Sequence, residues 1–151
     1  MTDIGFYHLT QTPLERALPQ ILEKAVASGK RTVVRAGSDE RVAFLNALLW
    51  TYDPASFLPH GTEREGDPEE QPIWLTAAGD NANGAQILVL TDGVEAADID
   101  GFERCLEMFD GRDPDAVAVA RDHWRDYREK GFGLTYWQQS ESGGWEKKAD
   151  G

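Results

Sequence analysis

Three arginines and two aromatic residues gather in one short stretch, ARDHWRDYREK, at residues 120–130 of the 151-residue chain. If this stretch is helical, at about 100° per residue, Arg121, Arg125 and Arg128 form one stripe with Trp124 on its flank. Guanidinium groups bind carboxylates in bidentate fashion, and arginine and aromatic residues dominate protein-binding hot spots. The stretch therefore predicts a shallow site with an aromatic floor and a guanidinium rim, suited to a short peptide that carries a carboxylate and an apolar side chain.

The same arginines also have a purely structural interpretation. Like charges four residues apart mildly destabilise a helix, so local helix stability does not explain the spacing. Arg125 can pair with Asp122 or Glu129, whereas Arg121 and Arg128 have no acidic residue three or four positions away. They could instead meet some of the 27 Asp and Glu residues elsewhere in the fold. The two interpretations differ in the partner they predict for Arg121: an external carboxylate or an internal one.

The overall charge narrows the class of partner. The formal net charge is -12, from 15 basic and 27 acidic residues. Nonspecific nucleic-acid binding depends on basic side chains that neutralise phosphates, so we expect no direct binding to nucleic acid or to anionic lipid. The first residues do not resemble a signal peptide, and no run of 18 apolar residues predicts a membrane span. A small anionic partner fits the basic stretch better than extended DNA does.

Signatures of catalysis are absent from the sequence. His8, His60 and His123 are far apart and belong to no metal-binding spacing, so we expect no metal. The only cysteine, Cys105, lies in an apolar series and is interpreted as a core residue. Neither a glycine-rich phosphate loop nor a G-x-S-x-G nucleophile elbow occurs, so no cofactor is predicted. A small nucleotide-binding enzyme on a Rossmann-like sheet is the alternative from another functional class.

The elements that would position the basic stretch alternate between strand and helix. Apolar periodicity predicts strands at 4–9, 31–36, 72–76, 86–91 and 133–138, and helical spacing at 13–28, 38–50, 102–109 and 113–131. Thr12 and Glu15 form a capping-box pattern, and Asp113 precedes Pro114 in a second helix start. This alternation predicts an α/β sandwich with a largely parallel sheet. We expect one domain over residues 1–138 and a disordered tail over 139–151, which lacks periodicity.

Four segments resemble the chi subunit family of bacterial DNA polymerase III. They are FYHL near the start, LLWTYDPASFLPHG in the middle, PIWLT, and RDHWRDYREKGFGLTYW near the end. Their order and spacing are similar from Ile4 to Trp137. The resemblance implies a Rossmann-like three-layer α/β sandwich, with a largely parallel sheet flanked by helices. It also implies a cytoplasmic bacterial protein without enzymatic activity, an accessory of the clamp-loader complex.

The resemblance also implies partners and site residues. The family links the replisome to single-stranded-DNA-binding protein by gripping that protein's acidic C-terminal tail, and its best-known member binds the psi subunit of the clamp loader. By position, the tail would contact Arg121 and Arg125, and Arg128 could serve either the pocket or the helix end. Trp124 stands where the family often has Tyr, Phe57 where it has an aromatic pocket wall, and Trp50 is a further candidate with a core role as its alternative. These six residues are the predicted binding site: Arg121, Trp124, Arg125, Arg128, Phe57 and Trp50.

Overall fold

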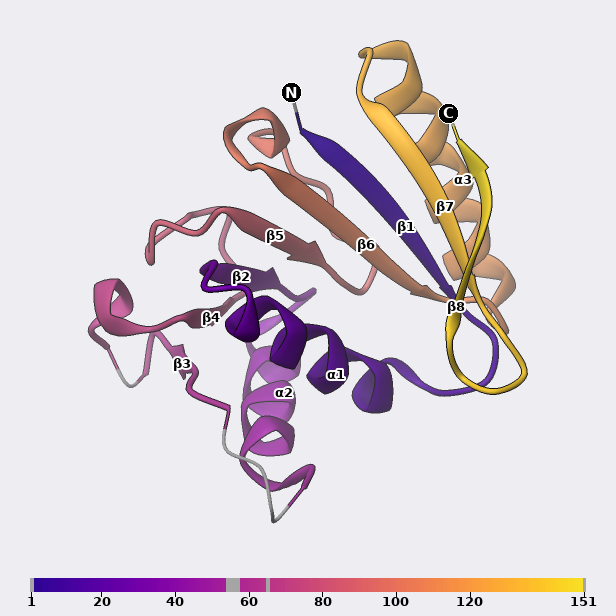
Figure 1. The fold of residues 1–151 in the computed structure, drawn as a ribbon. Coiled ribbons are helices and arrows are strands. Elements are labelled where there is room, and N and C mark those ends of the chain that lie inside the picture. The colour runs from indigo at the N-terminus through magenta and orange to yellow at the C-terminus, as the bar shows by residue number, and fades with distance from the viewer. Residues whose placement is uncertain (1, 54–57, 65, 151) are drawn as a thin grey trace.

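The computed structural model describes residues 2–53, 58–64 and 66–150, and Figure 1 shows their arrangement. Within these ranges, eight strands form one sheet in the order β3-β4-β2-β5-β6-β1-β7-β8. The strands are β1 (Asp3–Leu9), β2 (Thr32–Arg35), β3 (Gly61–Thr62), β4 (Ile73–Thr76), β5 (Ile87–Leu90), β6 (Arg104–Asp110), β7 (Gly133–Gln139) and β8 (Trp145–Asp150). Neighbours pair in parallel except β7 and β8, which pair antiparallel. The predicted α/β class with a largely parallel sheet is confirmed.

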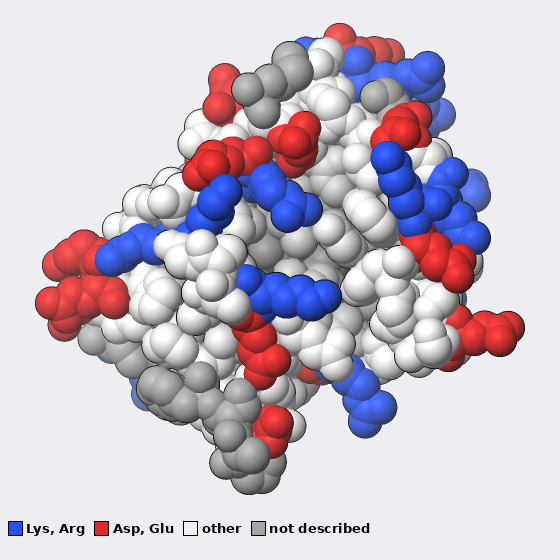
Figure 2. All heavy atoms as spheres, viewed as in Figure 1, with Lys and Arg blue, Asp and Glu red and all other residues white. Residues whose placement is uncertain are grey.

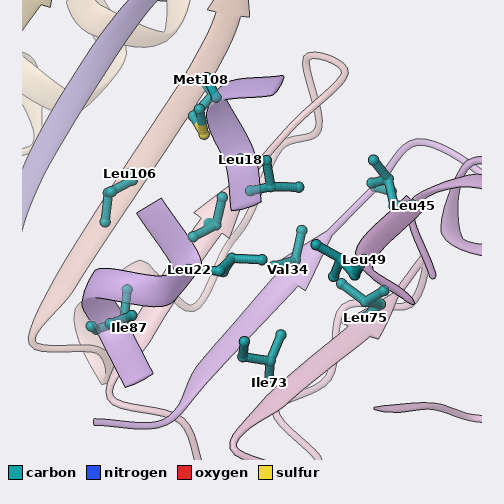
Figure 3. Close-up of a cluster of buried hydrophobic side chains, with 14 of the residues drawn as sticks. Leu18, Leu22, Val34, Leu45, Leu49, Ile73, Leu75, Ile87, Leu106 and Met108 are labelled. Carbon is teal, nitrogen blue, oxygen red and sulfur yellow. The ribbon is translucent and has the colours of Figure 1, made fainter. Parts of the chain in front are cut away.

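Helices cover both faces of this sheet. Helices α1 (Leu14–Ala27) and α2 (Asp39–Thr51) pack on one face, and α3 (Pro114–Glu129) packs on the other, behind the sheet in Figure 1. Two single 3-10 turns, η1 (Pro68–Glu70) and η2 (Ile99–Gly101), lie in the connections. Leucines of α1 and α2 meet strand residues such as Val34 and Leu106 in one buried cluster (Figure 3). Because side chains alternate across a strand, a sheet covered on both faces buries every residue of its central strands, as in β2 and β5, and β5 is a continuous apolar run.

The start of α3 follows the sequence prediction, whereas the start of α1 does not. The Asp113 carboxylate accepts a hydrogen bond from the Asp115 backbone N–H at 3.0 Å, and Pro114 occupies the first turn. The predicted capping box at Thr12 is wrong, because Pro13 is the N-cap of α1 and provides no side-chain cap. The Thr12 hydroxyl instead accepts a hydrogen bond from Gln139 Nε2 at 2.8 Å, which ties the loop before α1 to β7.

The helical spacing predicted over residues 102–109 is also wrong, because this segment contains strand β6. All consecutive side chains from Cys105 to Phe109 are buried. This is because β6 lies between β1 and β5 and has packed layers on both faces. When a short segment is apolar at every position, its hydrophobic pattern shows neither the two-residue period of a strand nor the 3.6-residue period of a helix. Periodicity alone therefore cannot distinguish the two. Cys105 is nevertheless a core residue, as predicted, and none of its side chain is exposed.

The structure differs from the sequence expectation at the C-terminal end. Residues 145–150 form β8, which pairs with β7 beyond a turn at Ser140–Gly144, where a disordered tail was expected. The Trp145 ring packs edge-on against Tyr7 with centroids 5.0 Å apart. That contact gives the extension an apolar anchor which its polar composition did not indicate. Among the described helices, none combines the length and apolar character needed to cross a membrane.

A buried ion pair near η2 yields a first testable prediction. The Arg35 side chain is 2% exposed and makes two hydrogen bonds, of 2.6 and 2.8 Å, to the Asp98 carboxylate, which lowers the pKa of Asp98. Asp98→Ala would leave the buried guanidinium unpaired. We expect the free energy of unfolding at neutral pH to fall by about 2 kcal/mol, less than for a fully buried pair because Asp98 itself is half exposed.

Urea denaturation of Asp98→Ala beside the exposed neighbour variant Asp100→Ala measures this effect. Because the folded pKa of Asp98 is lowered, the contribution is present above the ordinary value of 3.8 and is lost as the pH falls through the folded value. Equal stability of the two variants at neutral pH would show that Arg35 does not depend on this carboxylate.

Candidate functional site

Helix α3 presents two different surfaces. Ala120, His123 and Tyr127 recur at helical spacing and are buried against the sheet. Trp124 is partly buried at the edge of this contact, and Arg121 and Arg125 are exposed beside it. The helix ends where Gly131 takes a positive φ of 88°, a conformation that glycine adopts without strain. The predicted arginine stripe therefore flanks the line along which α3 meets the strands.

A cavity of about 370 Å³ opens along this line. Residues of β1, β6, α3 and β7 line it: Phe6, His8, Phe109, Val117, Ala120, Arg121, Trp124, Arg125 and Tyr136. They meet because β1 lies between β6 and β7 in the sheet, which places distant parts of the chain under one helix. The cavity is thus an aromatic floor with two guanidinium groups at its margin.

Aromatic contacts hold the floor in place. The Trp124 ring packs edge-on against Phe6, with centroids 5.2 Å apart, and lies 6.2 Å from Tyr136. Nδ1 of His8 and the Tyr136 hydroxyl form a hydrogen bond across β1 and β7. Position 111, directly after β6, has to be glycine, since a Cβ atom there would overlap the His8 ring. The floor is therefore preformed by packing within the protein.

The two guanidinium groups at the cavity margin differ in whether they already have an ion-pair partner. Arg125 pairs with Asp122 one turn earlier on α3, as the spacing predicted. Arg121 makes no ion pair or hydrogen bond with any residue in the described ranges. Burial lowers the pKa of His8, and the nearby charge of Arg121 lowers it further. The cavity margin consequently has one guanidinium free to bind a carboxylate and one that would have to exchange its partner.

The other predicted site residues lie elsewhere or are not described. Arg128 is exposed one turn further along α3 and does not line the cavity. Trp50 lies on α2, across the sheet from α3, with its ring 4.6 Å from His60. Phe57 falls outside the described residues. The structure thus brings together Arg121, Trp124 and Arg125 and does not place Trp50 with them.

Sequence reasoning predicted an aromatic floor but identified only Trp124 of it. Phe6, His8 and Tyr136 contribute to it, and the first two alternate with residues that face the other side of the sheet. That alternation in the first strand was a usable signal, but its meaning depends on which strand neighbours which. Groups of three or more potential metal ligands do not occur in the described part of the chain.

A buried polar network fixes α3 beneath this site. The Glu107 carboxylate, from β6, lies 2.8 Å from His123 Nδ1 and accepts a hydrogen bond from the Tyr127 hydroxyl at 3.2 Å. Burial raises the pKa of Glu107, and the hydrogen bond to Glu107 raises the pKa of His123. His123 and Tyr127 flank Trp124 in sequence, so this network sets how the tryptophan enters the cavity.

Comparison with known proteins identifies related sequences. The sequence profile of the family described as "DNA polymerase III chi subunit, HolC" matches residues 1–135. A Rickettsia prowazekii protein named "Probable DNA polymerase III subunit chi" is 28% identical over 109 residues, which cover 72% of this chain and 66% of that protein, just under two thirds. A Pseudomonas aeruginosa protein named "DNA polymerase III subunit chi" is 25% identical over 137 residues, which cover 89% of this chain and 94% of that protein.

Proposed function

The chain belongs to the DNA polymerase III chi subunit family, and we propose that it is a non-catalytic accessory subunit of the clamp-loader complex. In this role it links the replisome to single-stranded-DNA-binding protein, whose acidic C-terminal tail it binds. One observation supports the tail site most directly: Arg121, without a partner among the described residues, stands at the margin of a preformed aromatic cavity in a chain of net charge -12. We further infer a Rossmann-like three-layer sandwich and a location in the bacterial cytoplasm.

The chemistry of the cavity matches such a tail. An apolar terminal side chain can enter between Phe6, Trp124 and Tyr136, where water would otherwise cover apolar surface. The terminal carboxylate can then form bidentate hydrogen bonds with Arg121. Acidic residues further back along the tail would meet Arg125, and Arg128 lies beyond it on the same helix. The acidic surface of the rest of the chain would repel the tail and favour this one location.

An adaptor also needs a second surface, and α2 offers one across the sheet. Phe44 and Trp50 are large hydrophobic side chains that are 50% and 51% exposed. The Arg41 guanidinium lies over the Phe44 ring, 5.3 Å from its centroid. Contiguous exposed apolar patches, rather than single exposed hydrophobic side chains, mark interaction surfaces. We assign this side to the clamp-loader partner, the psi subunit or its equivalent.

Arg121→Ala tests the tail site. Titration calorimetry with a synthetic peptide of the single-stranded-DNA-binding protein C-terminus is expected to give micromolar affinity for the unmodified protein, about -8 kcal/mol. Loss of the bidentate contact should weaken binding tenfold or more.

Arg128→Ala is the matched control, because it removes the same charge from the same helix outside the cavity. It should weaken binding less than threefold, through long-range attraction alone. Equal losses in both variants would mean that only the general charge of α3 attracts the tail. If the unmodified protein gives no heat of binding with the peptide, the proposed function is wrong and the cavity has only a structural role.

A further inference from the structure

A second cavity of about 370 Å³ lies on the opposite face of the sheet, between α1, the middle strands and β8. Figure 2, which shows this face, has a hollow of mostly uncharged atoms near its centre, with both basic and acidic side chains around it. Known ligand pockets have volumes of roughly 300–1,000 Å³ and are mostly apolar with a few polar groups. This cavity is therefore large enough for a small ligand, and the proposed tail site lies on the other side of the sheet.

Its wall is aromatic. The Tyr7 and Trp137 rings are stacked, with centroids 6.3 Å apart and planes 12° apart, and Trp145 meets Tyr7 edge-on at 84°. Trp137 and Trp145 both lie beyond residue 135, where the match to the family profile ends. The strand β8 is held in place by its ladder with β7. The segment outside the family match thus completes this wall.

Some polar groups of the cavity lack a hydrogen-bond or ion-pair partner among the described residues. Thr32 lines it, and the buried Thr32 Oγ1 has no hydrogen-bond partner in the described structure. Lys24 and Arg104 are exposed at the margin and make no ion pair with any described residue, although Arg104 Nη2 donates to the Tyr7 hydroxyl at 3.4 Å. In so acidic a chain, two unpaired cations beside one aromatic wall indicate an anionic ligand. A buried hydroxyl without a partner costs free energy, which a ligand could recover.

We propose that this cavity binds a small aromatic anion. The aromatic ring lies against Tyr7, Trp137 and Trp145, as aromatic pairs prefer. The anionic group meets Arg104 and Lys24. The polar end of the site lies toward the amino ends of the strands, because Thr32 and Arg104 are the first residues of β2 and β6, whereas Tyr7 and Trp137 are the fifth residues of β1 and β7. Nucleotides in open α/β sheets bind outside the carboxyl ends, so this is a different kind of site.

Titration with 1-anilinonaphthalene-8-sulfonate, itself an aromatic anion, tests the proposal by nuclear magnetic resonance. Trp→Phe variants assign the indole N–H signals, so that Trp137 and Trp145 report this cavity and Trp124 reports the other. We expect the Trp137 and Trp145 signals to shift saturably. The double variant Lys24→Gln/Arg104→Gln should weaken this binding about tenfold, and Thr32→Val about threefold.

Lys30→Gln is the matched control, since Lys30 is paired with Glu103 and does not line the cavity. Lys30→Gln should change the affinity for the probe by less than twofold. Thermal denaturation shows whether each variant is folded. Unshifted Trp145 signals, or unchanged affinity in the double variant, would overturn the proposal. Displacement of the probe by 4-hydroxybenzoate assigns the ligand to aromatic carboxylates, and displacement by thymidine monophosphate to nucleotides. Tighter binding of single-stranded oligothymidine than of either competitor would overturn a small-molecule site in favour of a nucleic-acid one.

Discussion

Trp124→Ala is expected to weaken binding of the single-stranded-DNA-binding protein tail about a hundredfold, the largest effect on affinity that the structure predicts. Buried aromatic anchors at the centre of an interface contribute at least 2 kcal/mol each, and 2.7 kcal/mol corresponds to a hundredfold. Trp124 joins the Phe6 side of the cavity to the Tyr136 side. Its removal takes away both the apolar contact and the floor that holds the terminal side chain near Arg121.

Two variants make this result specific. Trp124→Phe keeps an aromatic ring at the site and should lose less than tenfold, whereas Trp145→Ala removes the same side chain from the opposite face and should leave tail affinity unchanged. Titration calorimetry gives the affinities, and circular dichroism shows whether each variant keeps its helix content. Full affinity in a folded Trp124→Ala protein would mean that the tail binds the arginines without entering the cavity.

The sequence predicted the residues that α3 contributes to this cavity better than the strand residues of its floor. The positions of Arg121, Trp124 and Arg125 follow from one helix and its 3.6-residue period, which is local information. The floor needs Phe6 and Tyr136 side by side, and that depends on β1 entering the sheet next to β7. Sheet order is not encoded in the period of any one strand, so residues more than 100 positions apart could not be paired from patterns alone.

Two further differences between sequence expectation and structure have the same origin. Segment 102–109 contains a strand whose two faces are both buried by neighbouring elements. The spacing of its apolar residues is equally compatible with a helix. Trp50 resembled a pocket residue by its place in the LW pair, but helix α2 packs on the face that α3 does not cover. In both cases the tertiary environment decided what the local pattern left open.

The largest expected effect on stability belongs to the network beneath α3. His123→Ala should lower the free energy of unfolding by about 3 kcal/mol at pH 6, because it leaves the Glu107 carboxylate buried without its ion-pair partner. Tyr127→Phe keeps the ring packing and removes one hydrogen bond to Glu107, so it should cost only about 1 kcal/mol. Urea denaturation of both variants beside the unmodified protein gives the values.

The pH dependence separates this network from simple packing. Burial raises the pKa of Glu107, and the Glu107 hydrogen bond, with Glu95 and Asp126 nearby, raises that of His123 above 6.5. The folded state therefore binds protons that the unfolded state has already released, and stability should fall as the pH rises from about 6.5 through the folded pKa of His123. His8, whose pKa is lowered, acts in the opposite sense below 6.5, but it is present in every variant and cancels in the comparison. Glu107→Gln keeps the side-chain shape and removes the charge, so its stability should vary less over this range. A steep fall with pH that persists in Glu107→Gln would show that His123 does not owe its raised pKa to this carboxylate, and would assign that effect to the other nearby acidic groups, Glu95 and Asp126.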